Sequence, residues 1–169
     1  DPQGNPTGID TVEYDITHQL VEEFMLKANE MVATHLDNLG KNLAFRVHDE
    51  PASENIQDFV KLTRSFGFEM PDKPTTYAIQ KLFNEAVKSP YGQYLATSYI
   101  RRMKMAYYSP ENIGHYGLGL THYCHFTSPI RRYADLIVHR ILFGDVDNLE
   151  YLEEATLHCS EQERVSAKA

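Results

Sequence analysis

Residues 125–136 read HFTSPIRRYADL, and this stretch decides the fold of the second half of the chain. Ser128 followed by Pro129 is typical of a helix start, because serine caps free backbone N–H groups and proline is preset for the first turn. Apolar residues then recur at helical spacing, namely Ile130, Tyr133, Ala134, Ile137 and Ile141. We therefore predict a helix over residues 129–143 with one face in a core.

Two arginines, Arg131 and Arg132, fall in the first turn of this predicted helix. Cations there oppose the helix dipole, at a cost of about 0.3–1 kcal/mol each. The same helix end offers free N–H groups, and guanidinium forks match phosphate oxygens. The pattern favours a phosphate site over the alternative, an ordinary surface ion pair between Arg131 and Asp135.

The preceding segment, NIGHYGLGL at residues 112–120, is rich in glycine, which permits tight turns or close approach of a ligand to the backbone. Rings cluster around it, namely His115, Tyr116, Tyr123, His125 and Phe126. They could stack on bases, although each is individually more typical of packing.

Hydrophobic periodicity elsewhere predicts helices over residues 17–39, 53–67, 75–89 and 91–102. Short strands are expected at 43–47 and 103–108, with an extended stretch at 121–127. The fold class is therefore α+β, mainly helical with a few short strands. In the first helix we expect a buried apolar face made of Leu20, Val21, Phe24, Ala28, Met31, Val32 and Leu36.

The net charge of −8 is unevenly distributed, because residues 80–140 carry eight basic and three acidic side chains. Such a block forms either a local phosphate-binding surface or an ordinary solvated face. Cys124 and Cys159 lie outside any CxxC spacing, which favours a reduced, cytoplasmic setting. No apolar run is long enough for a membrane span. We expect both ends to be cut from a longer chain, since there is no initiator Met and the last helix is unfinished.

Together, HYGLGL at 115–120, HFTSPIRRYADL at 125–136 and HR at 139–140 resemble the signature of the RNase II/RNase R (RNB-domain) exoribonucleases. LVEEFMLKAN at 20–29 and CSEQER at 159–164 resemble two further helices of that family. The ribonuclease R branch is the better match, because HFTSPIRRY is kept in full. The resemblance implies that residues 1–169 form the C-terminal part of an RNB catalytic domain, truncated at both ends.

This resemblance implies a processive 3′–5′ exoribonuclease, a hydrolase that threads single-stranded RNA into a channel and releases 5′-mononucleotides. It places the catalytic arginine on Arg131 and a glutamate of the terminal-nucleotide pocket on Glu22. Arg132, Ser128 and Tyr116 are expected to contact phosphate or sugar.

The family uses Mg²⁺ held by clustered aspartates in the first half of the domain, and this chain has no such cluster. We interpret Asp10, Asp15, Asp145 and Asp147 as solvated acids, and assign no metal ligand here. The isolated chain is therefore expected to be inactive. Its expected partners are RNA, the missing N-terminal half of the domain and flanking S1 or cold-shock domains.

Two alternatives stay open. One is a zinc site drawn from His115, His122, Cys124, His125 and His139, although zinc sites usually have paired ligands at both ends. The other is a noncatalytic RNA-binding or interaction module derived from this family.

Overall fold

The computed structural model describes residues 6, 8, 14–144 and 148–168. Along the chain the elements are α1 (Ile16–Asn38), β1 (Phe45–Val47), α2 (Ser53–Ser65), α3 (Thr76–Ala86), α4 (Gly92–Ile100), β2 (Tyr107–Ser109), a 3₁₀ turn (Tyr116–Leu118), α5 (Tyr133–Leu142) and α6 (Leu149–Ser166). The predicted α+β class is confirmed. No helix in these ranges is long and apolar enough to cross a membrane.

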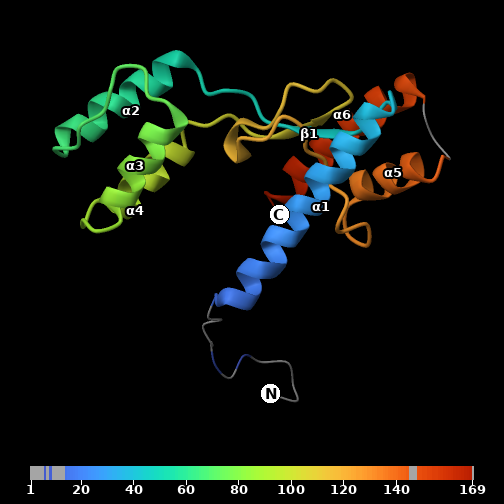
Figure 1. Ribbon diagram of the computed structural model, residues 1–169, viewed down its shortest axis with the longest axis horizontal. Helices are drawn as coiled ribbons and strands as arrows, with labels where there is room; N and C mark the ends of the chain where they lie inside the picture. Colours follow the sequence, from blue (N-terminus) through green and yellow to red (C-terminus); the bar gives the residue numbers. More distant parts are fainter. Residues whose placement is uncertain (1–5, 7, 9–13, 145–147, 169) are drawn as a thin grey trace.

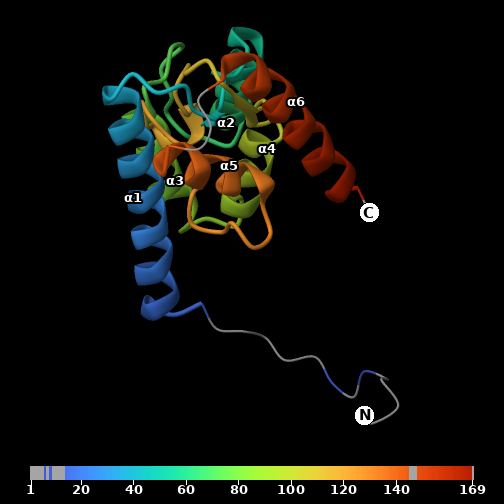
Figure 2. The same cartoon turned by 90° about the vertical axis from the view of Figure 1, so that its right-hand side faces the viewer.

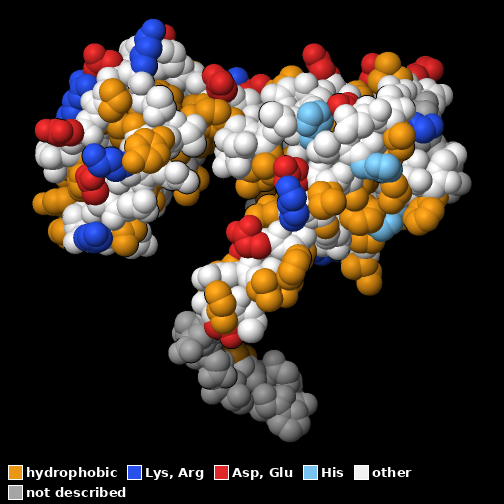
Figure 3. All heavy atoms as spheres, in the orientation of Figure 1, with side chains coloured by type: hydrophobic (Ala, Val, Ile, Leu, Met, Phe, Trp, Pro, Cys, Tyr) orange, Lys and Arg blue, Asp and Glu red, His pale blue; other side chains and the backbone are white. Residues whose placement is uncertain are grey.

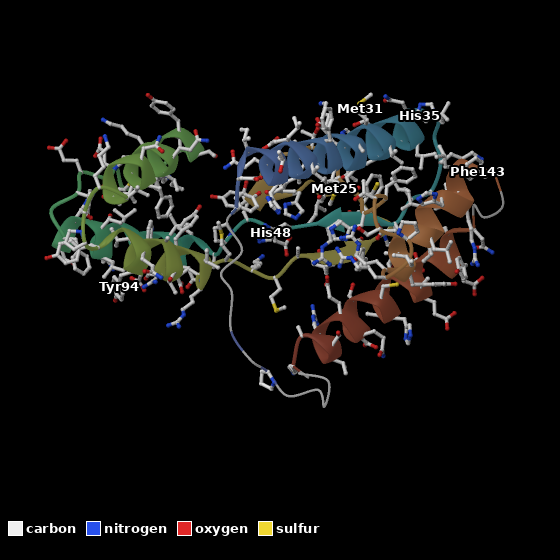
Figure 4. All side chains as sticks on the ribbon, turned by 90° about the horizontal axis from the view of Figure 1, so that it is seen from below. Met25, Met31, His35, His48, Tyr94 and Phe143 are labelled. Atoms are coloured by element: carbon white, nitrogen blue, oxygen red, sulfur yellow. The ribbon has the colours of Figure 1, made fainter. Side chains whose placement is uncertain are left out.

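The larger part of the molecule is built around strand β1. This strand pairs antiparallel with β2, with Arg46 opposite Tyr108. On its other side, the Arg46 N–H donates to the Tyr123 carbonyl at 2.8 Å and the His48 N–H to the Gly114 carbonyl at 3.0 Å. Helices α1 and α6 lie on opposite sides of the strands (Figures 2 and 4). The segment 112–124 is therefore held beside the strands without forming a regular strand itself.

One hydrophobic core joins these layers. Its members come from α1, β1, α5, α6 and the residues beside the strands, among them Leu36, Val47, Cys124, Ile137 and Leu152. Helices α2, α3 and α4 form a separate unit (Figure 1), whose own core is Phe59, Val60, Met70, Ile79 and Leu82. The described residues thus form two cores, joined by residues 48–52 and 101–106.

Helix α1 departs from the prediction in the face that it buries. Asn29, Ala33 and Leu36 are its buried residues. Of the residues expected inside, Leu36 is buried, whereas Leu20, Val21, Phe24 and Met31 are exposed. Leu20, Val21 and Phe24 lie in the first half of α1, which extends beyond the larger core, and Figure 3 shows hydrophobic side chains on its surface.

Helix α5 begins at Tyr133 rather than at residue 129, so the predicted helix start is wrong. Arg132 is the capping residue in extended conformation, and the Ser128 carbonyl accepts the N–H groups of Arg131 and Arg132 at 3.3 and 3.2 Å. Residues 128–132 therefore close into a turn. Ile130, expected in the core, is 97% exposed at this turn. Ser128 is not a helix cap, and neither arginine lies in a first helical turn.

We predict that Phe59→Ala destabilises the α2–α4 unit by about 3–5 kcal/mol, because a large buried ring leaves a cavity. Phe59 is fully buried, and its ring centroid lies 4.9 Å from that of Tyr99. Tyr77→Ala on α3 is the control, since Tyr77 is 75% exposed and surface changes usually stay within about 0.5 kcal/mol. Urea unfolding monitored by circular dichroism measures both variants. Equal losses would contradict the assignment of this core.

Candidate functional site

The loop over residues 121–132 is tied to α1 through the buried side chain of Asn29. The Asn29 Oδ1 accepts the backbone N–H groups of Phe126 at 2.9 Å and Thr127 at 3.2 Å, and its Nδ2 donates to the Tyr123 hydroxyl at 3.2 Å. Asn29 is only 3% exposed. A buried carboxamide with three partners is well satisfied and fixes the loop against the helix.

A second buried side chain, Asp135 on α5, ties the other end of the loop. Its Oδ1 accepts the Ser128 N–H at 2.7 Å. The Arg132 guanidinium donates through Nε to Oδ2 at 2.7 Å and through Nη2 to Oδ1 at 2.8 Å. The alternative pairing of Arg131 with Asp135 is therefore wrong, because Arg132 occupies the carboxylate. Contacts of Arg132 and Ser128 with RNA stay predictions.

Arg131 is exposed, and its guanidinium has no hydrogen-bond or ion-pair partner among the residues that the structure describes. It lines an open pocket of about 690 Å³ with Tyr108, Arg132, Cys159 and Glu163, among others. The neighbouring charges are paired, because Glu163 receives two hydrogen bonds from Arg46, at 2.7 and 3.0 Å. An anion that entered this pocket would find Arg131 free to bind it.

Four of the rings that could stack on bases lie in a continuous row, whereas Phe126 stacks on His139 with ring centroids 4.1 Å apart. Ring contacts connect Tyr116, His48, His115, Tyr123, His125 and Tyr108 in that order, with centroids 5.0–6.3 Å apart. The Arg46 guanidinium lies over the Tyr108 ring, with Cζ 4.6 Å from the ring centroid. These contacts favour packing as the role of most of the rings. Figure 4 shows His48 between the α2–α4 unit and the larger core.

Burial keeps two histidines of this row neutral. Loss of solvent lowers the pKa of His125 to about 3, helped by the nearby charge of Arg132. Burial likewise lowers the pKa of His115 to about 4. The Tyr108 hydroxyl lies 2.8 Å from Nδ1 of His125 and can donate to it when the ring is neutral. Burial raises the pKa of Tyr108 to about 12, so this donor keeps its proton.

The glycines of the 112–120 segment serve turns and close packing, and an approach of their backbone to a ligand stays a prediction. The Gly117 N–H donates to Nδ1 of His48 at 2.9 Å, and a Cβ on Gly117 would lie 2.7 Å from that nitrogen. Gly114 has a φ of +78°, which favours glycine. These glycines let the backbone close on His48, a protein side chain.

Glu22 and Tyr116, the other predicted site residues, lie on different elements. Glu22 is exposed on the first half of α1, and its carboxylate accepts a hydrogen bond from the Tyr14 hydroxyl. Tyr116 opens the 3₁₀ turn, with its ring edge-on to His48 at 6.3 Å. Their roles toward RNA stay predictions.

No group of three metal-binding side chains occurs in the described part of the chain. The residues of the zinc alternative have other partners: His122 lies 3.0 Å from Asp37 and His139 lies 3.0 Å from the Phe126 carbonyl. That alternative finds no support in their arrangement. Asp15 caps α1, and hydrogen bonds led by that of the Thr17 hydroxyl lower its pKa to about 2. Asp10, Asp145 and Asp147 lie outside the described residues.

The basic block of residues 80–140 does not act as one unpaired set of charges. Lys81 lies 3.9 Å from Glu85 on α3, and Lys104 lies 3.3 Å from Asp49. Arg132 is held by Asp135. Part of the positive charge of this block is therefore balanced by neighbouring carboxylates.

Asn29 and Asp135 are the two organising residues that pattern reasoning missed. Both carried a signal, because each is a polar residue in line with an apolar helical position: Asn29 precedes Ala33 by four residues, and Asp135 precedes Val138 by three. A polar residue on an apolar helix face is expected to hold a buried partner.

Comparison with known proteins identifies what the chain is similar to. The RNB domain family matches residues 1–144. Ribonuclease R of Chlamydia pneumoniae is 47% identical over 156 residues, which cover 90% of this chain and 23% of that protein. Ribonuclease R of Aquifex aeolicus is 40% identical over 179 residues, covering 100% of this chain and 25% of that protein. The chain thus spans about a quarter of the length of these relatives.

Solved structures agree. Mycoplasma genitalium RNase R in complex with ribose methylated single-stranded RNA superposes with a TM-score of 0.80 at 28% identity, covering 90% of this chain and 26% of that one. Yeast Ssd1, described as a pseudonuclease, superposes with a TM-score of 0.74 at 27% identity, covering 83% of this chain and 19% of that one. The fold is therefore found both in RNase R and in a protein described as a pseudonuclease.

We predict that His125 makes stability fall as the pH drops below about 6.5. In the folded state its pKa is about 3, whereas the unfolded side chain takes up a proton near its ordinary value of 6.5. The stability that the neutral His125 ring contributes is fully present above pH 6.5 and is lost progressively as the pH falls toward 3. Urea unfolding between pH 7 and 5 should show a shallower pH dependence in His125→Gln, whose amide oxygen can still accept from Tyr108. Identical slopes would contradict the buried, neutral ring.

Proposed function

The chain belongs to the RNB domain family, and on that basis we propose that it forms the C-terminal part of the catalytic domain of a processive 3′–5′ exoribonuclease. In this proposal the whole protein hydrolyses single-stranded RNA to 5′-mononucleotides in the cytoplasm. The observation that carries it is the unpaired Arg131 guanidinium beside an open pocket, in a chain similar to ribonuclease R.

Arg131 is proposed to act on the scissile phosphate. The phosphate gains negative charge in the transition state, and a guanidinium that is already positioned stabilises that charge through two parallel N–H bonds. Arg131 suits this role because no carboxylate in the described ranges neutralises it. The residue would thus lower the barrier of the chemical step more than it strengthens ground-state binding.

Other proposed contacts with RNA are more peripheral. Glu22 would accept hydrogen bonds from the sugar of a terminal nucleotide, since a carboxylate only accepts. Tyr116 would offer its ring or its hydroxyl, and the Ser128 hydroxyl could donate to a phosphate oxygen. Arg132 has Nη1 left for a phosphate, because Nε and Nη2 bond to Asp135.

The Mg²⁺ that the resemblance implies does not fit the residues described here. They contain no group of three metal-binding side chains, and Asp15 is engaged in capping α1. We therefore assign no metal ligand among the described residues and derive no step through the ion. Its ligands are proposed to lie in the N-terminal half of the catalytic domain, with S1 or cold-shock domains flanking it as further RNA-binding parts.

A noncatalytic RNA-binding or interaction module is the second candidate. The likeness to Ssd1, described as a pseudonuclease, favours it specifically. The two candidates differ in whether the parent protein carries clustered aspartates upstream of this segment.

We predict that Arg131→Ala in the full-length protein lowers kcat on the order of 10²–10³-fold, the usual effect of losing a preorganised transition-state donor. RNA affinity should change only modestly. Single-turnover release of mononucleotides and filter binding measure the two quantities. Arg101→Ala, an exposed arginine at the end of α4, is the control for lost charge. Equal losses of binding and turnover would assign Arg131 to positioning the RNA.

We also predict that the isolated chain releases no mononucleotides from single-stranded RNA, with or without added Mg²⁺, because the metal ligands are proposed to lie elsewhere. The assay is thin-layer or gel analysis of labelled RNA with the purified chain, and full-length protein is the positive control. Mg²⁺-dependent activity of the pure chain would overturn the assignment of the ligands to another segment.

A further inference from the structure

The adjacent residues Arg131 and Arg132 have opposite environments. Arg132 gives two N–H bonds to the Asp135 carboxylate, at 2.7 and 2.8 Å, and its side chain is 21% exposed. Arg131 is exposed and lines the pocket without a partner in the described ranges. One arginine of the pair is therefore immobilised while its neighbour is available.

Asp135 is the group that creates this difference. It is fully buried, yet it accepts the backbone N–H of Ser128 at 2.7 Å as well as both bonds from Arg132. A buried carboxylate is costly unless it is paired and hydrogen-bonded, and these three donors satisfy it. Removing the charge of Asp135 would leave the guanidinium of Arg132 without its counter-ion.

The contacts of Asp135 bracket Arg131 in the chain. Ser128 is held on one side and Arg132 on the other, and the Ser128 carbonyl also accepts the N–H of Arg131. The backbone of Arg131 is thus part of a turn closed at both ends by one carboxylate. Thr127, the residue before Ser128, is fixed to α1 through Asn29. These bonds fix the position of the Arg131 Cα, whereas its guanidinium is exposed and has no partner in the described ranges.

We propose that Asp135 is a positioning residue for Arg131, acting through Arg132 and the Ser128 N–H. The proposal rests on the proposed function, in which Arg131 meets the scissile phosphate. Arg132 serves as the brace of the turn, which means that its two N–H bonds to Asp135 hold residues 128–132 in place. Its side chain neutralises Asp135, so that Arg131 supplies the unpaired charge of the turn. A small displacement of such a catalytic group can cost up to about 10²-fold in rate.

Asp135→Asn in the full-length protein tests the proposal. It keeps the size of the side chain and an acceptor for the Ser128 N–H, but loses the bidentate charge pair. We expect kcat to fall roughly tenfold or more, with little change in KM. Val138→Ala on the same helix is the control for stability, because Val138 is fully buried and takes no part in the hydrogen bonds of Asp135. A comparable loss of kcat in Val138→Ala, at equal loss of Tm, would make the role of Asp135 merely structural.

A double-mutant cycle makes the mechanism explicit. If Asp135 acts through Arg131, Asp135→Asn should have no further effect on kcat in an Arg131→Ala background. An undiminished effect there would overturn the proposal while leaving the role of Arg131 intact. Wild-type kcat in Asp135→Asn would overturn it as well. Wild-type kcat in Arg131→Ala would instead refute the proposed function, so the two failures are distinguishable.

Arg132→Lys provides a second variant should Asp135→Asn fail to fold. Lysine keeps the charge beside Asp135 but cannot form the two parallel N–H bonds. We expect the same fall in kcat, again absent in the Arg131→Ala background. Full activity of Arg132→Lys would contradict a requirement for the bidentate brace.

Discussion

Partly buried backbone without regular secondary structure must find its hydrogen-bond partners elsewhere, and this constraint governs residues 126–128 of the loop over residues 121–132. An unpaired buried N–H group costs about 1–3 kcal/mol, so such a loop needs side chains that take the place of a neighbouring strand or helical turn. Asn29 and Asp135 are those side chains. They serve Phe126, Thr127 and Ser128 in succession. The backbone N–H groups of these three residues are therefore hydrogen-bonded, as they would be in a strand, although the loop has no regular secondary structure.

The same two side chains connect three elements that are distant in sequence. Asn29 belongs to α1 and Asp135 to α5, while the loop that they hold leads from the segment beside β1. Cys124, within the loop, pairs with Phe45 of β1 in an isolated bridge. Displacement of either helix would therefore reach the loop directly, because the connecting bonds are 2.7–3.2 Å long and partly buried. The α2–α4 unit has its own core and lies outside this network.

The sequence predicts the helices well and their buried faces less well. Periodicity located α1 nearly to the residue, because its apolar positions recur at 3.6-residue spacing whichever side they face. It assigned Phe24 to the interior, since periodicity cannot say whether another element covers a helix. It also began α5 at Pro129. A serine–proline pair is a good local signal, but the buried Asp135 binds Ser128 and draws that residue into a turn instead. Long-range hydrogen bonds of this kind have no sequence period.

Charge pairing explains why Arg131 differs from its neighbouring arginines at the pocket. Of the described arginines near this pocket, Arg46 is offset by Glu163 and Arg132 by Asp135. Arg140 instead donates to the Tyr133 hydroxyl and lies over the Tyr133 ring. The neighbouring ring of His125 is neutral at physiological pH, because burial holds its pKa at about 3. In the pocket lining beside Tyr108, Arg131 therefore has the guanidinium without a hydrogen-bond or ion-pair partner in the described ranges. A single exposed guanidinium attracts RNA only weakly over distance, since salt screens it within about 8–10 Å. Its effect is strongest at contact, where charge on a bound phosphate changes, and this favours a role in the reaction over one in capture.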